Sequence, residues 1–201
     1  MHPESDAALV FRCLDGDTDA FAGLVKRYQN AVYATAHYYM GRYGAADDVS
    51  QEAFWQAYRS LPHLRDPDRF GPWLKEVTTR TAANWLRKNM TRLRTETPLP
   101  QRRTVRIEDA RKGPQGIAER GEIYERVQLA IDTLPERYRL VVILRYMQEM
   151  SYEEISRFTG ESKDEVRGIL QRASVQLRDL LGEASGQTNK ESQAKWSSDR
   201  K

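Results

Sequence analysis

Apolar residues recur at steps of three and four along most of this chain, which is the spacing of an α-helix that buries one face. The first such helix is predicted to follow a cap at Asp17 or Thr18 and to end at Gly41. Two more are predicted over residues 45–61 and 72–89. No stretch alternates for long in the manner of a β-strand, so the pattern predicts an all-α protein.

The helical pattern fails between residues 91 and 121, where prolines, glycines and charged residues crowd together. Such a composition is typical of a linker. The pattern then resumes and fades near Gly182, before a polar tail over residues 184–201 that we expect to be disordered. The sequence therefore predicts two small helical domains, a helical bundle over residues 1–90 and a second unit over 122–183, joined by a flexible basic linker.

The second unit carries the signals of a helix-turn-helix. Ser151 with Glu154, and Ser162 with Glu165, each form a Ser-x-x-Glu capping box, which marks the beginning of a helix. Gly160 lies between the two boxes, where a glycine permits a left-handed turn. These signals predict a short helix, a tight turn and a further helix, which is the arrangement of a helix-turn-helix.

The helix after the turn has two different faces. One face is apolar, and a separate stripe carries arginine and glutamine, whose side chains suit base edges and phosphates in a DNA groove. The same stripe would also occur on the solvated face of an ordinary three-helix bundle, so both interpretations remain open. Residues 122–183 hold 9 Lys and Arg against 12 Asp and Glu, and 9 − 12 gives a net charge of −3. We therefore expect this unit to bind DNA weakly by itself.

The N-terminal unit separates its charges along the chain. Residues 44–58 contain Asp47, Asp48 and Glu52 and no basic residue, whereas residues 84–106 contain seven Lys and Arg and a single Glu. A basic stretch near tryptophans suits phosphates and stacked bases. A solvated helix end followed by a charged linker would look the same, and this alternative also remains open.

Composition narrows the function classes. The 201 residues are 30% charged and 39% hydrophobic, and the formal net charge is only +3. Cys13 is the single cysteine, which excludes an internal disulfide or a cysteine-rich zinc site. The N-terminus has no signal-peptide pattern, and the longest uncharged stretch, 14 residues, is shorter than the roughly 20 that a membrane span needs. We expect a cytoplasmic protein without direct membrane insertion.

Known catalytic and metal-binding patterns are absent from the sequence. It contains no His-Glu-x-x-His motif, no glycine-rich phosphate loop and no nucleophile elbow. None of the three histidines completes the Glu-x-x-His pair of a di-iron bundle. The sequence therefore predicts a protein that is not an enzyme, with no catalytic residues, no metal, no cofactor and no small-molecule substrate.

Four motifs in order resemble the extracytoplasmic-function (ECF) sigma factors of bacterial RNA polymerase. They are "GDTDAFAGLVKRYQNAVYATA", "ADDVSQEAFWQAY", "RFGPWLKEVTTRTAANWLRK" and "LPERYRLVVILRYMQEMSYEEISRFTGESKDEVRGILQRASVQLRDLL". The resemblance covers about residues 5–90 and 122–182. It implies a sigma region 2-like domain over 1–90 and a sigma region 4-like domain over 122–183.

The resemblance also implies roles for particular residues. The acidic helix would bind the clamp helices of core RNA polymerase, through Asp47, Asp48, Gln51, Glu52 and Phe54. The loop over residues 62–70 and the following helix would melt and read the minus-ten promoter element, through His63, Arg65, Asp66, Phe70, Trp73, Arg80, Asn84, Arg87 and Lys88. The final helix would read the minus-thirty-five element through Lys163, Arg167, Gly168, Gln171 and Arg172.

These roles imply a promoter-specificity subunit whose partners are core RNA polymerase, promoter DNA and an anti-sigma factor. The chain departs from the family at Arg80 and Asn84, which stand where Asn and Asp are common, and at Asp164-Glu165-Val166, which stands for Gly-Thr-Val. Two other hypotheses are a stand-alone dimeric helix-turn-helix regulator and a helical interaction protein that does not read DNA. The separated acidic and basic stretches favour the sigma factor.

Overall fold

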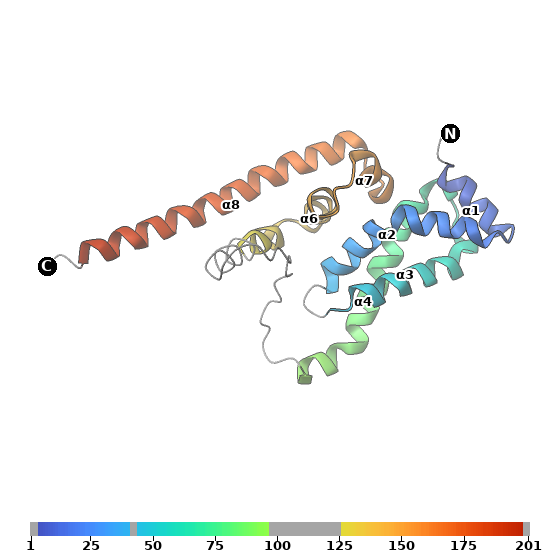
Figure 1. Ribbon diagram of the computed structural model, residues 1–201, viewed down its shortest axis with the longest axis horizontal. Coiled ribbons are helices and arrows are strands. Elements are labelled where there is room, and N and C mark those ends of the chain that lie inside the picture. The colour runs from blue at the N-terminus through green and yellow to red at the C-terminus, as the bar shows by residue number, and fades with distance from the viewer. Residues whose placement is uncertain (1–3, 41–43, 97–125, 199–201) are drawn as a thin grey trace, which may run out of the picture. The chain divides into compact units, whose positions relative to one another are not determined.

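The structure of the protein is a computed structural model that describes residues 4–40, 44–96 and 126–198, and every element in these ranges is a helix (Figure 1). The all-α fold class predicted from the sequence is therefore confirmed. The chain divides into two compact units. The first consists of Met1–Arg103 with Leu140–Arg167, and the second of Thr104–Arg139 with Gly168–Lys201.

The first unit is built around three long helices. These are α2 (Thr18–Met40), α3 (Ala46–Ser60) and α4 (Phe70–Glu96), which lie side by side, and α1 (Asp6–Leu14) packs against α2 (Figure 1). Two short 3-10 turns, η2 (Leu61–His63) and η3 (Pro67–Arg69), connect α3 to α4. Small buried residues such as Ala31, Ala53 and Ala57 line the facing surfaces, so the helices approach closely.

The beginnings of these helices follow local chemistry. Asp17 caps α2, because its Oδ1 accepts hydrogen bonds from the backbone N–H of Asp19 at 3.0 Å and Ala20 at 3.3 Å. Ser5 caps α1 by accepting from the N–H of Ala8 at 3.2 Å, but the sequence analysis did not predict this helix. Its nine residues hold too few turns for a clear periodic signal.

Helix α4 is longer than predicted at both ends. It begins at Phe70 rather than Pro72 and continues to Glu96, beyond the predicted end at Asn89. The added residues include Met, Leu, Arg and Glu, which are good helix formers, and no proline occurs until Pro98. The predicted linker therefore begins with a helical segment, and its residues 97–121 lie outside the described ranges.

The helix-turn-helix predicted from the sequence is present. After α6 (Glu136–Val142) and the π-helical turn η4 (Ile143–Met147), the first unit contains α7 (Tyr152–Thr159), which is followed by α8 (Lys163–Ser198). Both capping boxes form, at Ser151 with Glu154 and at Ser162 with Glu165. Gly160 ends α7 in the left-handed conformation, with φ +79°.

The sequence pattern predicted that the last helix ends near Gly182. In the structure this helix continues to Ser198. The segment after Gly182 contains no proline, and isolated glycines cost a helix only about 1 kcal/mol each, so nothing in the sequence forces an end there. The predicted boundary relied on a loss of apolar periodicity, which reports burial rather than helix formation.

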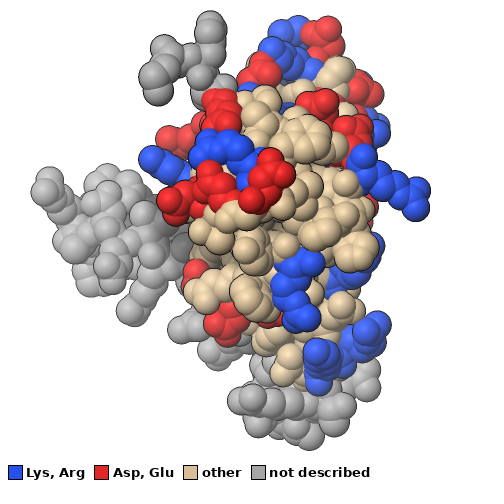
Figure 2. Space-filling view, turned by 90° about the vertical axis from the view of Figure 1, so that its right-hand side faces the viewer, with Lys and Arg blue, Asp and Glu red and all other residues tan. Residues whose placement is uncertain are grey.

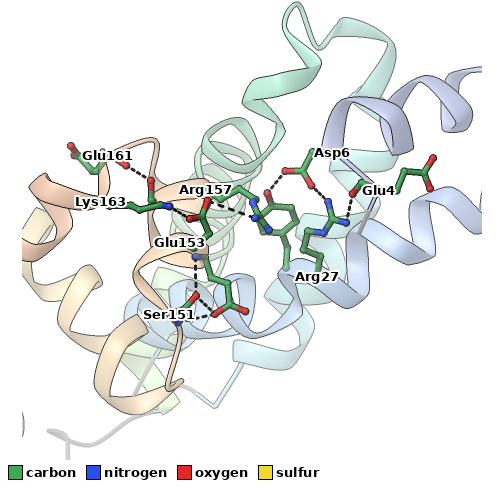
Figure 3. Close-up of polar contacts among 11 residues, drawn as sticks. Glu4, Asp6, Arg27, Ser151, Glu153, Arg157, Glu161 and Lys163 are labelled. Carbon is green, nitrogen blue, oxygen red and sulfur yellow. Dashed lines mark hydrogen bonds and ion pairs between the residues drawn. The ribbon is translucent and has the colours of Figure 1, made fainter. Parts of the chain in front are cut away.

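Tyr28 on α2 contacts helices α1, α4 and α7 of the first unit. Its side chain is 2% exposed, and its hydroxyl donates to the buried carboxylate of Asp6, which also accepts from Arg27. Figure 3 shows Arg27 between Asp6 and Glu4. Arg27 Nη2 donates to the backbone oxygen of Glu4 at 2.6 Å. The Tyr28 ring packs against Phe70 of α4 at 5.6 Å and Phe158 of α7 at 6.0 Å, measured between ring centroids.

Helices α4 and α7 touch through backbone atoms within this unit. A Cβ atom placed on Gly71 would lie 2.2 Å from the carbonyl oxygen of Arg157 and 3.0 Å from the Tyr28 hydroxyl. Beside this contact, Lys75 Nζ donates to the carbonyl oxygen of Thr159 at 3.4 Å, which satisfies an acceptor at the end of α7. Only glycine permits so close an approach at position 71.

We expect Gly71→Ala to lower the free energy of unfolding by about 1–3 kcal/mol, because the new methyl group overlaps the Arg157 carbonyl. Gly23→Ala in α2 is the matched control, since its Cβ would meet only the Leu9 side chain at an ordinary 3.5 Å. The control should be neutral or slightly stabilising. Urea denaturation measures both variants, and equal stability of the two would contradict the close packing.

The Ser151 box gives a second prediction. Hydrogen bonds from the Ser151 hydroxyl and backbone N–H hold the pKa of the Glu154 carboxyl below its ordinary value. Because the folded pKa is depressed, this stabilisation is present above the unfolded pKa and is lost as the pH falls through the folded value. Ser151→Ala should therefore cost about 1 kcal/mol at neutral pH and less in acid.

Denaturation midpoints of the wild type and the Ser151→Ala variant over a pH series check this sign. Ser174→Ala is the control, since that hydroxyl donates to the Leu170 carbonyl inside a helix and caps nothing. A difference between wild type and Ser151→Ala that grows toward low pH would show that the Glu154 carboxylate is not part of the cap.

Candidate functional site

Helix α3 presents four of its five predicted partner-binding residues to solvent. Its buried positions include Ala46, Val49 and Ala53, which pack on α2 and α4, so the intervening polar positions face outward. Of the five predicted residues, Asp47, Asp48, Gln51 and Glu52 are exposed, while Phe54 is half-buried. The carboxylates therefore form an acidic surface on a rigid helix, which suits a basic partner.

This acidic surface continues into two exposed aromatic side chains, Trp55 and Tyr58. Trp55 is 55% exposed, and its ring stacks on Tyr58 at 6.3 Å, while Tyr58 meets Phe21 edge-on at 5.0 Å. Trp55 follows Asp48 by seven residues, and this spacing alone places it on the acidic face. Figure 2 shows one side of the molecule, on which a broad area without charged side chains lies among charges of both signs.

The predicted minus-ten residues divide into exposed and buried groups. His63, Arg65 and Asp66 are exposed in the loop that joins α3 to α4, and Asp66 caps η3 by accepting from the N–H of Asp68 at 3.1 Å. Trp73 is half-buried, with its ring 5.7 Å from that of Phe70. Phe70 itself is completely buried, so in this conformation its ring cannot stack on a base.

The basic row on α4 lies on one helix face. Leu74, Thr78 and Ala82 point into the core, whereas Arg80, Arg87 and Lys88 are exposed and Asn84 is half-buried. The Asn84 side-chain oxygen accepts from Arg87 Nη2 at 3.0 Å, so this arginine already has one partner in the free protein. Positions 80, 84, 87 and 88 recur at helical spacing, and such a row can follow the phosphates of one DNA strand.

Within the first unit, Lys163 and Arg167 lie at the start of α8 and are exposed, but both are paired. Lys163 forms an ion pair with Glu153 of α7, which lies beside Arg157 (Figure 3). The Lys163 ammonium group holds the pKa of the Glu153 carboxyl below its ordinary value. Arg167 Nη1 donates to Asp164 Oδ1 at 2.8 Å. Each of the two cations therefore already has a carboxylate partner within the protein.

In the second unit, Gln171 and Arg172 are exposed and Gly168 is half-buried. The Arg172 guanidinium lies over the ring of Tyr138, with Cζ 5.6 Å from the ring centroid, and its Nε donates to the Tyr138 hydroxyl at 3.0 Å. Nothing in the sequence points to Tyr138, because its partner Arg172 lies 34 positions away. The Arg172 side chain is thus already ordered before any ligand binds.

Two further observations concern the described parts of the chain. In residues 4–40, 44–96 and 126–198, His, Cys, Asp and Glu side chains form no group of three or more that could hold a metal ion. No helix in the same ranges has the length and apolar content needed to cross a membrane. The chemistry of the exposed residues is that of binding through charge, hydrogen bonds and aromatic surface.

Two family models match this chain. Sigma-70 region 2 matches residues 24–92, which contain the acidic surface of α3 and the basic row of α4. Sigma-70, region 4 matches residues 124–177, which contain the helix-turn-helix. The two matches occur in the order that the four sequence motifs predicted.

Individual proteins also resemble this chain. The ECF RNA polymerase sigma-E factor of Escherichia coli K12 is 32% identical over 84% of this chain and 90% of its own length. The ECF RNA polymerase sigma factor SigE of Mycolicibacterium smegmatis is 32% identical over 82% of this chain, which spans only 63% of that longer protein. The solved structure of CnrH in complex with the cytosolic domain of CnrY is 27% identical over 89% of this chain, with a TM-score of 0.55.

The family models, the identity to a relative matched over most of its length and the helix-turn-helix geometry agree with one another. Members of this family are transcription initiation factors and not enzymes. The chain belongs to the ECF family of RNA polymerase sigma factors.

Proposed function

We propose that this chain acts in the bacterial cytoplasm by binding core RNA polymerase and directing it to a specific set of promoters. The observation that carries the proposal is the separation of exposed charge within one small helical bundle. Helix α3 exposes only acidic and uncharged side chains along residues 46–58, before Arg59, whereas α4 exposes Arg80, Arg87 and Lys88 after Glu76. One surface therefore suits a basic protein partner and the other suits DNA.

The acidic surface is the polymerase-binding site in this proposal. Asp47, Asp48, Gln51 and Glu52 contact the clamp helices of the core enzyme, and half-buried Phe54 supports them. Trp55 extends the same face and supplies the large aromatic area that protein interfaces favour near their centres. The rigid helix keeps these groups in place before binding, which lowers the entropy that association costs.

The promoter is read in two places. The loop residues His63, Arg65 and Asp66, the half-buried ring of Trp73 and the basic row of α4 contact the melted minus-ten strand. Phe70, which is buried against Tyr28, contributes to this surface by supporting Trp73. The minus-thirty-five duplex is contacted by residues along the first turns of α8, namely Lys163, Arg167, Gly168, Gln171 and Arg172.

We assign residues 1–90 to core binding and the minus-ten element, residues 122–183 to the minus-thirty-five element, residues 91–121 to a linker and residues 184–201 to a tail. An anti-sigma factor regulates the chain in this proposal. CnrH, a relative of solved structure, is bound to the cytosolic domain of CnrY, which supports a protein regulator for this chain as well. The function needs no small-molecule substrate and no cofactor.

Charge reversal tests the acidic surface. Asp48→Lys with Glu52→Lys should weaken binding to bacterial core RNA polymerase by about 100-fold or more, because like charges then face the clamp. Asp15→Lys with Glu76→Lys reverses the same number of exposed carboxylates outside this surface and is the matched control. Fluorescence anisotropy of the labelled full chain titrated with core enzyme measures both.

Equal affinity of the two charge-reversed proteins for core polymerase would show that α3 is not part of the interface. Binding of the wild type to a palindromic DNA duplex as a dimer, with no binding to core polymerase, would instead identify a stand-alone helix-turn-helix regulator. Binding of neither core enzyme nor DNA would favour the third hypothesis, a helical interaction protein.

The upstream contacts give a separate prediction. Arg167→Ala and Gln171→Ala should each lower the use of the minus-thirty-five element by about 5- to 100-fold, since a good side-chain-to-base contact contributes roughly 1–3 kcal/mol. Affinity for core polymerase should stay unchanged. In vitro transcription from promoters with and without the upstream element, compared with core titration, separates these effects, and an equal loss in both assays would contradict a base-reading role.

A further inference from the structure

Arg172 is held in one place by an aromatic residue from another helix of the second unit. Its Nε donates to the Tyr138 hydroxyl at 3.0 Å, and its guanidinium carbon lies 5.6 Å from the centre of the Tyr138 ring. An exposed arginine normally moves among many rotamers, and ordering it on a ligand costs entropy. Here two interactions on the same tyrosine restrain the side chain before a ligand arrives.

Gly168 provides the space for this arrangement. A Cβ atom on Gly168 would lie 3.3 Å from Arg172 Nη1 and 3.6 Å from Arg172 Nη2. The distance to Nη1 is shorter than an ordinary van der Waals contact. The guanidinium therefore lies back along α8 over the residue one turn before it. Gly168 has no positive φ, and glycine weakens a helix interior relative to alanine, so neither property favours glycine here. What glycine provides at this position is space for the Arg172 guanidinium.

Tyr138 itself is fixed at the beginning of α6. Its backbone N–H donates to the Pro135 carbonyl at 2.8 Å, and the neighbouring Leu134 is 1% exposed. The Leu134 carbonyl accepts from Arg139 Nη2 at 2.9 Å, which ties the first turn of α6 to the segment before it. The tyrosine ring is half-buried, so it is a rigid platform rather than a mobile surface side chain.

We infer that Tyr138 is a positioning residue that presents Arg172 to a guanine edge in the upstream promoter duplex. This inference rests on the proposed reading of the minus-thirty-five element by α8. Because Nε is occupied by the tyrosine, the two Nη groups remain as a pair of donors. Guanine displays two acceptors, O6 and N7, on its major-groove edge, and a pair of arginine donors matches them.

A contact that only joins α6 to α8 would have different consequences. Loss of a purely structural contact lowers stability and weakens binding to every DNA sequence in proportion. Loss of a positioning contact lowers the preference for one base pair and leaves binding to other sequences nearly unchanged. The Gly168→Ala variant distinguishes a structural contact from a positioning contact in a second way. Alanine stabilises the helix, but its methyl group displaces the Arg172 guanidinium.

The first measurement tests the geometry without DNA. In the full chain labelled with ¹⁵N, the Nε–H proton of Arg172 should exchange with water more slowly than that of exposed Arg178. Tyr138→Phe should make the two rates equal, whereas Tyr146→Phe, at an exposed tyrosine, should leave the difference in place. Equal rates in the wild type would overturn the positioning role whatever the function of the chain.

The second measurement tests the consequence. Holoenzyme made from this chain and bacterial core polymerase selects from a duplex promoter library randomised over the upstream element. Tyr138→Phe should lower the preference for guanine at one base pair by about threefold to tenfold, as expected for one lost hydrogen bond. Arg172→Ala should abolish the preference at that same position, and adding Tyr138→Phe to it should change nothing more.

Gly168→Ala should reduce the preference at that base pair while raising the denaturation midpoint. A uniform loss across all library sequences would place Arg172 on a phosphate and overturn the guanine assignment. An unchanged preference in Tyr138→Phe, with slow Nε–H exchange in the wild type, would overturn the role in reading DNA. In that case a loss of upstream selection in Arg167→Ala would still support the proposed function.

Discussion

The first unit depends on the burial of one polar side chain, that of Tyr28. A buried hydroxyl without a partner is costly, and this one is satisfied by Asp6, a carboxylate that is buried in turn and paired with Arg27. Burial and the Asp6 carboxylate raise the pKa of the Tyr28 hydroxyl well above its ordinary value, so it remains a donor. One residue thereby joins α1 through its hydroxyl to α4 and α7 through its ring.

This arrangement separates what folds the unit from what binds. The Tyr28 network and the alanine-rich helix faces are inside, and the proposed contacts to polymerase and to the minus-ten strand lie on outward positions of α3 and α4. Changes to those outward charges should cost little stability, since exposed charges contribute little to folding. Phe70 is the exception to this separation of folding from binding. It belongs to the buried network and also supports Trp73 near the proposed DNA surface.

Local signals carried most of what the sequence could predict. Periodicity located α2 and α3, and the spacing of Ser151 and Glu154 predicted a cap that the structure contains. Long-range contacts left no such trace. Asp6 meets Tyr28 across 22 residues and Arg172 meets Tyr138 across 34, and neither pairing follows from helical spacing. The family resemblance implied that Phe70 contacts the minus-ten element, and only its packing against Tyr28 shows that it is buried.

The charges around α8 fit the proposed role of this net-negative region, residues 122–183, in promoter selection. Lys163 and Arg167 are paired with carboxylates, and Arg172 is held by Tyr138, so each cation has a partner before DNA arrives. In the proposed function, nonspecific phosphates must displace the carboxylate partners of Lys163 and Arg167 for little gain, which keeps general affinity low. A correct base edge offers directional acceptors that repay the exchange. In the proposed function, affinity for the promoter comes from core polymerase and the basic row of α4, while α8 supplies selection.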